Sequence, residues 1–182
     1  MRMVLPAMEE RMFGGDKPLI ELRPVHMWNL PIEEHIGGLE WDKILNFVSE
    51  RAGNRCEFCE AGPNHKGIFG KRAFEFKVHL RFSHDDNTRI ATLKRLVHVC
   101  SGCNYATHLK QAQLKSANMP SDRSLFVVAM KRLMFFHKLT ENEVKTWLDR
   151  ELALWASRKN VAYPDQIDVA VVEAGLDRLW RP

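Results

Sequence analysis

The sequence has 182 residues, of which 45% are hydrophobic and 27% are charged, and its net charge is +4. These values are ordinary for a globular protein and exclude wholesale disorder, and the length suits one well-buried domain or a core with a helical appendage. Because it has neither a run of about eighteen apolar residues nor a secretion-signal pattern, we expect an intracellular protein without a membrane partner.

The first fifty residues contain one clear helical pattern. We expect residues 1–20 to be irregular, because glycine and proline interrupt them, and residues 21–38 to form an extended segment that wraps around the core. A helix follows over residues 39–51, and Gly53 is placed to cap its C-terminus. The apolar residues that recur at helical spacing in it are Trp41, Ile44, Leu45, Phe47 and Val48.

The middle of the chain has the alternation of a β-hairpin. Residues 73–82, AFEFKVHLRF, alternate apolar and polar side chains and predict a strand with one apolar face. The polar face carries Lys77, His79 and Arg81, and we expect it either to be solvated or to contact phosphate groups. A polar turn and a second strand at residues 90–99 complete the hairpin.

Three helices are predicted after residue 103. The first begins near residue 104 or 105 and runs to about residue 115, and the second covers residues 123–138. The third begins at a capping box formed by Thr140 and Glu143. We expect the aromatic side chains of these helices to fill the core, with a protein-binding surface as the alternative; they include Phe135, Phe136, Trp147 and Trp155.

Four cysteines carry the strongest chemical signal. Cys56 and Cys59 form one Cys-x-x-Cys pair, and Cys100 and Cys103 form another about forty residues later. Two such knuckles can supply four thiolates to one tetrahedral Zn²⁺, and because this fills every position, the zinc would be structural rather than catalytic. Two disulfides are the alternative, which the spacing and the expected reducing compartment disfavour.

Positive charge is concentrated around these cysteines. Residues 51–116 contain twelve Lys and Arg and five Asp and Glu, which gives an excess of +7. Residues 1–50 contain five Lys and Arg and nine Asp and Glu, which gives a net charge of −4. A zinc ion with four thiolates contributes −2, so the middle segment stays positive. We therefore expect a polyanionic partner, DNA or RNA; the alternative is that the basic residues only offset the zinc–thiolate charge.

The residues beside the cysteines resemble the HNH endonuclease family, in particular its zinc-stapled bacterial and phage branch. The run RAGNRCEFC, at residues 51–59, matches the R-x-G-x-R-C-E-x-C knuckle of that branch. A strand histidine follows, and LVHVCSGCNYATH, at residues 96–108, matches its second knuckle. The resemblance covers residues 28–108, with weaker similarity to residue 155. It implies a ββα-metal core and a cytoplasmic location in a bacterial or phage-infected cell.

The resemblance also implies a set of site residues. The four cysteines match the family's structural zinc ligands, and His79 matches the general base that activates water for attack on a phosphodiester. A divalent cation, Mg²⁺ or Mn²⁺, would stabilise the leaving oxygen, with Asn104, His108 and Asp85 as candidate ligands. The residues expected to contact nucleic acid are Lys77, Arg81, Lys94, Arg95 and Lys110.

Two positions depart from the family pattern and define competing hypotheses. Val78 stands where the family often has a ligand before the base, and Asn104 stands where it has a histidine after the last cysteine. The first hypothesis is a metal-dependent DNA endonuclease that uses His79. The second is an HNH-derived module that has lost cleavage but binds nucleic acid. The third is a protein-interaction factor, for example a phage or mobile-element inhibitor of host machinery.

Together these patterns predict an α+β fold, in which a zinc-stapled ββα-metal core is extended by C-terminal helices. The predicted divisions are an irregular segment at 1–20, an HNH-like core at 21–116, a helical extension packed on the core at 117–160, and a tail at 161–182.

Overall fold

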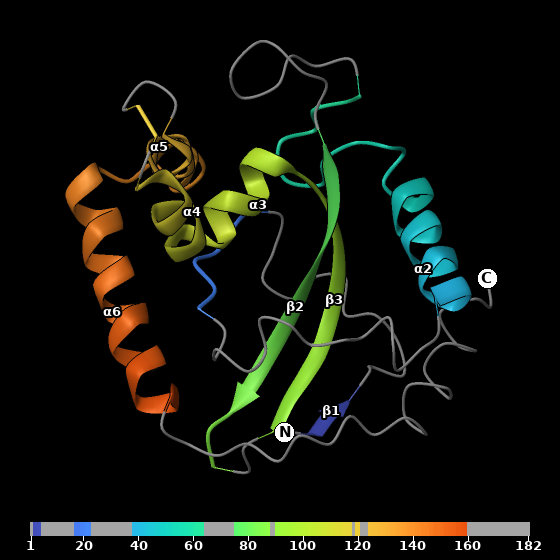
Figure 1. Ribbon diagram of the computed structural model, residues 1–182, viewed down its shortest axis with the longest axis horizontal. Coiled ribbons are helices and arrows are strands. Elements are labelled where there is room, and N and C mark those ends of the chain that lie inside the picture. Colours follow the sequence, from blue (N-terminus) through green and yellow to red (C-terminus); the bar gives the residue numbers. More distant parts are fainter. Residues whose placement is uncertain are drawn as a thin grey trace.

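A computed structural model describes residues 2–4, 17–22, 38–63, 75–87, 90–117, 119–120 and 124–159. The fold is mixed α/β: a long hairpin has one helix on one side and a group of helices on the other (Figure 1). Among the described residues, no helix is both long and apolar enough to cross a membrane. The wrapped segment expected at residues 23–37 and the tail at 161–182 lie outside the described residues.

Helix α2, Gly38–Arg51, forms as its periodicity predicts. Ile44 and Val48, one turn apart, are buried against the hairpin. The helix ends because Gly53 adopts a φ of 60°, a left-handed conformation that glycine reaches without strain. The Gly53 and Asn54 amides then donate back into the last turn, to the Glu50 and Ser49 carbonyls, as in a Schellman motif. This turn directs the chain into the first cysteine pair.

Strands β2, Phe76–Asp85, and β3, Ile90–Cys100, pair antiparallel and form the predicted hairpin. The first strand begins and ends three residues later than the range 73–82 that the alternation predicted. A register shift lies between Arg81, which pairs with Arg95, and Phe82, which pairs with Leu93. One residue of β3 is therefore extra at this point, as in a β-bulge.

A third strand was not predicted. Strand β1, Arg2–Val4, pairs parallel with residues 90–92 of β3, so the sheet order is β1-β3-β2. The expectation that residues 1–20 are irregular is therefore wrong for residues 2–4. Three residues are too few to give a period-two pattern in the sequence, and the pairing depends on the exposed edge of β3.

Helix α2 lies over the apolar face of the hairpin (Figure 1). Ile44, Val48 and Leu96 form the buried centre of this contact, and the partly buried side chains of Val78 and Leu80 pack against them. The apolar half of the β2 alternation therefore has the role that the sequence predicts.

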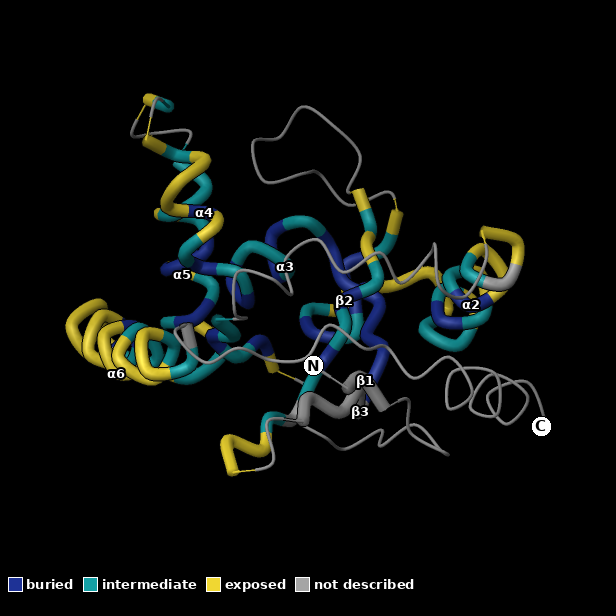
Figure 2. Tube along the Cα trace, turned by 60° about the horizontal axis from the view of Figure 1, so that its bottom comes forward, coloured by how far each residue is buried: buried dark blue, intermediate teal, exposed yellow. Residues whose placement is uncertain are grey.

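Two of the three side chains on the polar face, those of His79 and Arg81, are buried as well, so the expectation of a solvated face is wrong for these two; Lys77 is exposed. His79 is 2% exposed and Arg81 is 0% exposed. Arg81 donates through Nη2 to the Lys17 carbonyl, and Glu21 contacts both side chains, so residues 17–22 lie against this face. Figure 2 shows a run of buried residues at the end of β3, at residues 95–100, whereas most residues of β2 are of intermediate burial.

The helix after the second cysteine pair differs from its prediction. Helix α3, Ser101–Thr107, begins three to four residues earlier than expected, because Cys100 is extended, at φ −72° and ψ 157°, and serves as the N-cap. The helix is interrupted at His108, at φ −98° and ψ 53°, and α4, Leu109–Ser116, follows. The single predicted helix is thus two helices joined at His108.

The last two helices match their predictions closely. Helix α5, Leu125–His137, starts at Ser124, whose side chain accepts from the Val127 amide, and α6 covers Glu141–Lys159. Together with α3 and α4 they enclose a core centred on the fully buried residues Leu109, Ala112, Ala129, Leu133 and Val144.

The capping box of α6 gives a local test of the fold. The Thr140 hydroxyl accepts from the Glu143 amide, and the Glu143 carboxylate accepts from the Thr140 amide and hydroxyl. Thr140→Ala should lower the free energy of unfolding by about 1 kcal/mol, because the Glu143 amide loses the hydroxyl oxygen that accepts its hydrogen bond. Urea unfolding should show no loss for the matched control, Thr146→Ala on the exposed side of the same helix; equal losses would contradict the cap.

Candidate metal centre

The sulfur atoms of the four cysteines lie close together. One sulfur from each of Cys56, Cys59, Cys100 and Cys103 lies within 4.8 Å of all the others, and no disulfide joins them. The sulfur atoms of Cys59 and Cys100 are 3.7 Å apart. A tetrahedron with Zn–S bonds of about 2.3 Å has edges of about 3.8 Å, so this spacing fits a shared metal ion. The donor set is therefore arranged to hold a metal ion.

The first knuckle is a tight turn fixed by its own backbone. The Cys56 amide donates to the Ala61 carbonyl, and the Glu60 amide donates back to the Cys56 carbonyl. Glu60 has a φ of 57°, so the chain reverses there through a left-handed residue. This reversal lets both sulfurs of the knuckle point to the same place.

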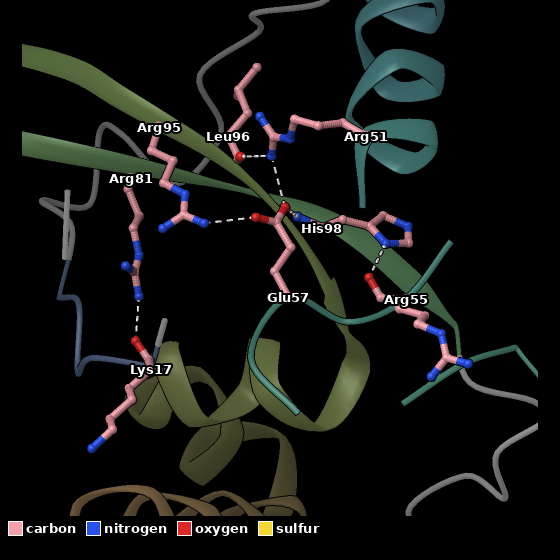
Figure 3. Close-up of polar contacts among 8 residues, drawn as sticks. All are labelled: Lys17, Arg51, Arg55, Glu57, Arg81, Arg95, Leu96 and His98. Carbon is pink, nitrogen blue, oxygen red and sulfur yellow. Dashed lines mark hydrogen bonds and ion pairs between the residues drawn. The ribbon is translucent and has the colours of Figure 1, made fainter. Parts of the chain in front are cut away.

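Glu57, between the two cysteines of the first knuckle, joins this turn to the hairpin. Its carboxylate accepts from Arg51 at 2.8 Å, from Arg95 at 2.7 Å and from the His98 amide at 2.8 Å (Figure 3). Arg51 also donates to the Leu96 carbonyl at 2.7 Å. The end of α2, the knuckle and β3 are therefore held by one carboxylate.

The electrostatics of Glu57 favour the ionised form. Burial alone would raise the pKa of this carboxyl, but the His98 amide and the Arg51 and Arg95 guanidinium groups outweigh it and hold the pKa below its ordinary value.

The R-x-G-x-R-C-E-x-C pattern is explained by these contacts. Arg51 pairs with Glu57, Gly53 makes the left-handed turn, and the Arg55 carbonyl lies 2.8 Å from Nδ1 of His98. The residues of the motif that are not cysteines thus build the scaffold of the knuckle.

The second knuckle joins the end of β3 to the start of α3. Cys100 is the last residue of β3, Cys103 lies in the first turn of α3, and both are fully buried. The Ser101 amide donates to the Glu75 carbonyl, next to the start of β2. The antiparallel pairing of the hairpin therefore determines where this cysteine pair lies.

Arg132 of α5 reaches the metal centre from the helical side. Its Nη1 donates to the Cys103 sulfur at 3.2 Å. A Cβ atom at Gly102 would lie 2.6 Å from Arg132 Nε, so a side chain at this position would displace the guanidinium. Burial would lower the pKa of Arg132, but the negative charge of Cys103 and its neighbours outweighs this and raises it.

Without a cation the four thiols compete for protons. Hydrogen bonds from Cys100 and Cys103 lower the pKa of Cys56 to about 7. In contrast, the contacts of Cys103 with Cys100, Cys56 and Cys59 raise its pKa far above the ordinary value. Four thiolates cannot coexist at this spacing unless a metal ion neutralises them, so the chemistry of the donor set also fits a bound metal.

His79, the residue predicted as general base, is enclosed. Its Nε2 lies 3.1 Å from Oε2 of Glu21, and its ring meets the His108 ring edge-on at a centroid distance of 4.9 Å. Arg81 Nε lies 3.6 Å from the other Glu21 oxygen. The histidine therefore has a carboxylate to orient it, but a fixed guanidinium cation shares that carboxylate.

The predicted ligands of a catalytic cation are only partly brought together. His108 is next to His79, and Asn104 lies one turn earlier on α3. Asp85 is exposed and lies six strand residues from His79, roughly 20 Å at the rise of a strand, so it cannot share a cation with it. Among the described residues, only the cysteines form a group of three or more His, Cys, Asp or Glu close enough to hold a metal.

The residues predicted to contact nucleic acid divide into two groups. Lys77 is exposed and Lys110 is partly exposed on α4. Arg81 and Arg95 are buried and lie directly opposite each other in the hairpin, where like charges would repel. Each is paired with its own carboxylate, Glu21 or Glu57, so the expectation that they contact phosphates is corrected. The side chain of Lys94 lies outside the described residues.

Sequence reasoning missed Glu21 and Arg132. Both are distant in the chain from the residues they contact, 58 positions for Glu21 and His79 and 29 for Arg132 and Cys103. The only signal in the sequence was indirect: a buried histidine, arginine or thiolate cluster requires a partner of opposite charge.

Comparison of the chain with protein-family models, with curated proteins and with solved structures finds no match. The resemblance to HNH proteins therefore depends on the motifs themselves and on the arrangement of the knuckles.

Replacing Glu57 should test how the first knuckle is held. Glu57→Gln keeps the shape of the side chain but leaves two partly buried guanidinium groups without a counter-charge, so we expect a loss of about 3 kcal/mol in the free energy of unfolding. Urea unfolding of the metal-loaded protein measures it. Glu60→Gln is the matched control, since it removes an exposed carboxylate from the same knuckle; a similar loss in both variants would show that Glu57 has no special role.

Proposed function

We propose that the four cysteines hold one structural Zn²⁺. The donor set is all thiolate, the sulfur spacing suits a tetrahedral ion, and four protein ligands leave no position for a substrate. The residues that would hold the ion are Cys56, Cys59, Cys100 and Cys103, and zinc would supply folding energy there rather than reactivity.

We further propose that the chain is an HNH-like module that binds nucleic acid without cleaving it. The order of its parts supports the likeness: a knuckle, an antiparallel hairpin with a histidine, and a second knuckle that begins a helix. The observation that carries the absence of cleavage is the burial of His79, 2% exposed and held against Glu21. A general base must reach a water molecule beside the phosphate, and residues 17–22 lie in the way.

The surroundings of His79 also oppose a catalytic Mg²⁺ or Mn²⁺. Arg81 is buried beside the Glu21 carboxylate and provides a permanent positive charge where a divalent cation would need to bind. Val78 offers no ligand, and Asp85 is too distant. We therefore propose nucleic-acid binding, rather than nucleic-acid cleavage with His79 as general base, as the function of the chain.

The support for nucleic acid as the partner is the charge of the middle segment. Its excess of +7, in which Glu57 is already counted, exceeds the −2 of a zinc tetrathiolate, although Glu21 from the preceding segment offsets one of its cations, Arg81. Lys77 and Lys110 are the predicted contacts that stay accessible.

A second candidate function is binding to a protein, and one observation favours it. Phe135 on α5 is 78% exposed and Leu114 on α4 is 55% exposed, although the helical aromatic residues were expected to fill the core. Phe136 and Trp147, in contrast, pack against core clusters as expected. An exposed aromatic side chain is a typical element of a protein interface.

Metal removal should test the zinc proposal directly. Purified protein should contain one zinc per chain, and Cys59→Ser and Cys100→Ser should each lose the metal and the cooperative unfolding transition, because structural zinc contributes roughly 10–16 kcal/mol of apparent folding energy. Elemental analysis and thermal unfolding measure both effects. Soluble variants with unchanged stability, or a pair of disulfides detected by mass under non-reducing conditions, would contradict a zinc centre.

Incubation with DNA should separate binding from cleavage. We expect no nicking of supercoiled DNA in Mg²⁺ or Mn²⁺, but binding that weakens steeply with salt. Lys77→Gln and Lys110→Gln should each reduce the slope of log K against log salt by about 0.9 for duplex DNA. Lys145→Gln is the control, since Lys145 is already paired with Glu141 on α6.

Two results would contradict this ordering of functions. Metal-dependent nicking that disappears in His79→Ala would establish an endonuclease. Absence of binding to DNA and RNA at low salt, from protein that contains its zinc, would move the proposal to a protein partner.

A further inference from the structure

Arg132, a side chain outside the two knuckles, donates a hydrogen bond to a cysteine sulfur of the cluster. Its Nη1 lies 3.2 Å from the Cys103 sulfur, although the residue belongs to α5, 29 positions further along the chain. Helices α3 and α5 pack together, which brings the guanidinium to the first turn of α3. The contact therefore joins the helical layer to the metal centre.

The Arg132 side chain passes close to Gly102, which has no side chain. A Cβ atom at Gly102 would lie 2.6 Å from Arg132 Nε and 3.0 Å from both Cζ and Nη2. Gly102 lies in α3 and is buried, so alanine would suit the helical backbone but would displace the guanidinium. The glycine of the second knuckle is thus explained by the arginine, not by a turn.

We propose that Arg132 is the positioning and charge-balancing residue of the metal centre, acting through the Cys103 sulfur. The inference rests on the zinc proposal above. Four thiolates and one Zn²⁺ carry a charge of −2, and a guanidinium beside them offsets part of it. An N–H group that points at a metal-bound sulfur also draws electron density from it, so Cys103 becomes a poorer nucleophile and a less reactive target for electrophiles.

Within the part of the chain that the structure describes, the other cations near the cluster have different partners. Arg51 and Arg95 are both held by Glu57. Arg55 is exposed and donates to the Glu60 carbonyl. Lys131, the neighbour of Arg132 on α5, is exposed and serves as a control of equal charge.

The test measures zinc release from the zinc-loaded full-length chain. Each variant is treated with N-ethylmaleimide, and a chromogenic chelator reports the rate at which zinc is lost. Arg132→Gln should release zinc about tenfold faster than the original chain, as is typical when a residue that supports a metal ligand is removed. Gly102→Ala should accelerate release similarly, and Lys131→Gln should leave the rate unchanged.

The double variant tests whether the two residues act through one contact. If Gly102→Ala acts by displacing Arg132, the combination with Arg132→Gln should release zinc no faster than Arg132→Gln alone. In the Co²⁺-substituted protein, both single variants should shift the thiolate-to-cobalt charge-transfer band, whereas Lys131→Gln should not. Since alanine favours a helix over glycine, faster release from Gly102→Ala without a lower melting temperature would exclude a simple loss of stability.

Failure of this proposal is distinguishable from failure of the zinc proposal. An original chain that binds no metal would overturn both. An original chain with one zinc, and variants that release it at the original rate with an unshifted cobalt band, would overturn the role of Arg132 alone. If Arg132→Gln does not fold, Gly102→Ala still decides, because it retains the charge and removes only the contact.

Discussion

The convergence of four thiols from two distant segments is the constraint on which the other features depend. Sulfur atoms of Cys59 and Cys100 lie 3.7 Å apart although 41 positions separate them in the chain. Placing them there requires the knuckle turn, the antiparallel register and the start of α3 at Ser101 to agree. It also concentrates negative charge in a buried place, and buried charge must be paired. Glu57 fixes the first knuckle to β3, and Arg132 meets the second from α5.

Charge pairing also explains the face of the hairpin that is opposite α2. His79, Arg81 and Arg95 are polar residues at buried positions, and two of them are cations that face each other across the strands. Glu21 and Glu57, from different parts of the chain, make this arrangement tolerable. The interior of the protein therefore has an apolar layer beneath α2 and an ionic layer beneath residues 17–22 and the first knuckle. His79 lies in the second layer, where the ionic contacts of Glu21 enclose it.

Local signals in the sequence were sufficient for most elements and for the metal centre. The spacing of Trp41, Ile44 and Val48 predicted α2, and Thr140 with Glu143 predicted the start of α6. The two cysteine pairs predicted the cluster because ligand spacing is a local property. The wrong predictions have a common cause, which is that a local pattern does not show contacts with distant segments. The alternation in β2 separates two faces of the strand, but it does not show which face other parts of the chain cover. A strand β1 of three residues, the break at His108 and the partners Glu21 and Arg132 depend on contacts between distant segments.

The extra residue in β3 has a consequence for how the length of this hairpin can change. On the cysteine side of the bulge, Arg81 opposes Arg95; on the turn side, Phe82 opposes Leu93. A residue gained or lost on the turn side can be absorbed by shifting or removing the bulge, although the pairing of residues 90–92 with β1 and the ion pair between Asp86 and Arg158 would have to move with the tip. Between the bulge and Cys100, the same change would exchange the two faces of β3, the one with Leu96 and the one with Val97 and Val99, and displace the second knuckle. The position of the second knuckle is therefore more sensitive to the length of β3 between the bulge and Cys100 than to its length beyond the bulge.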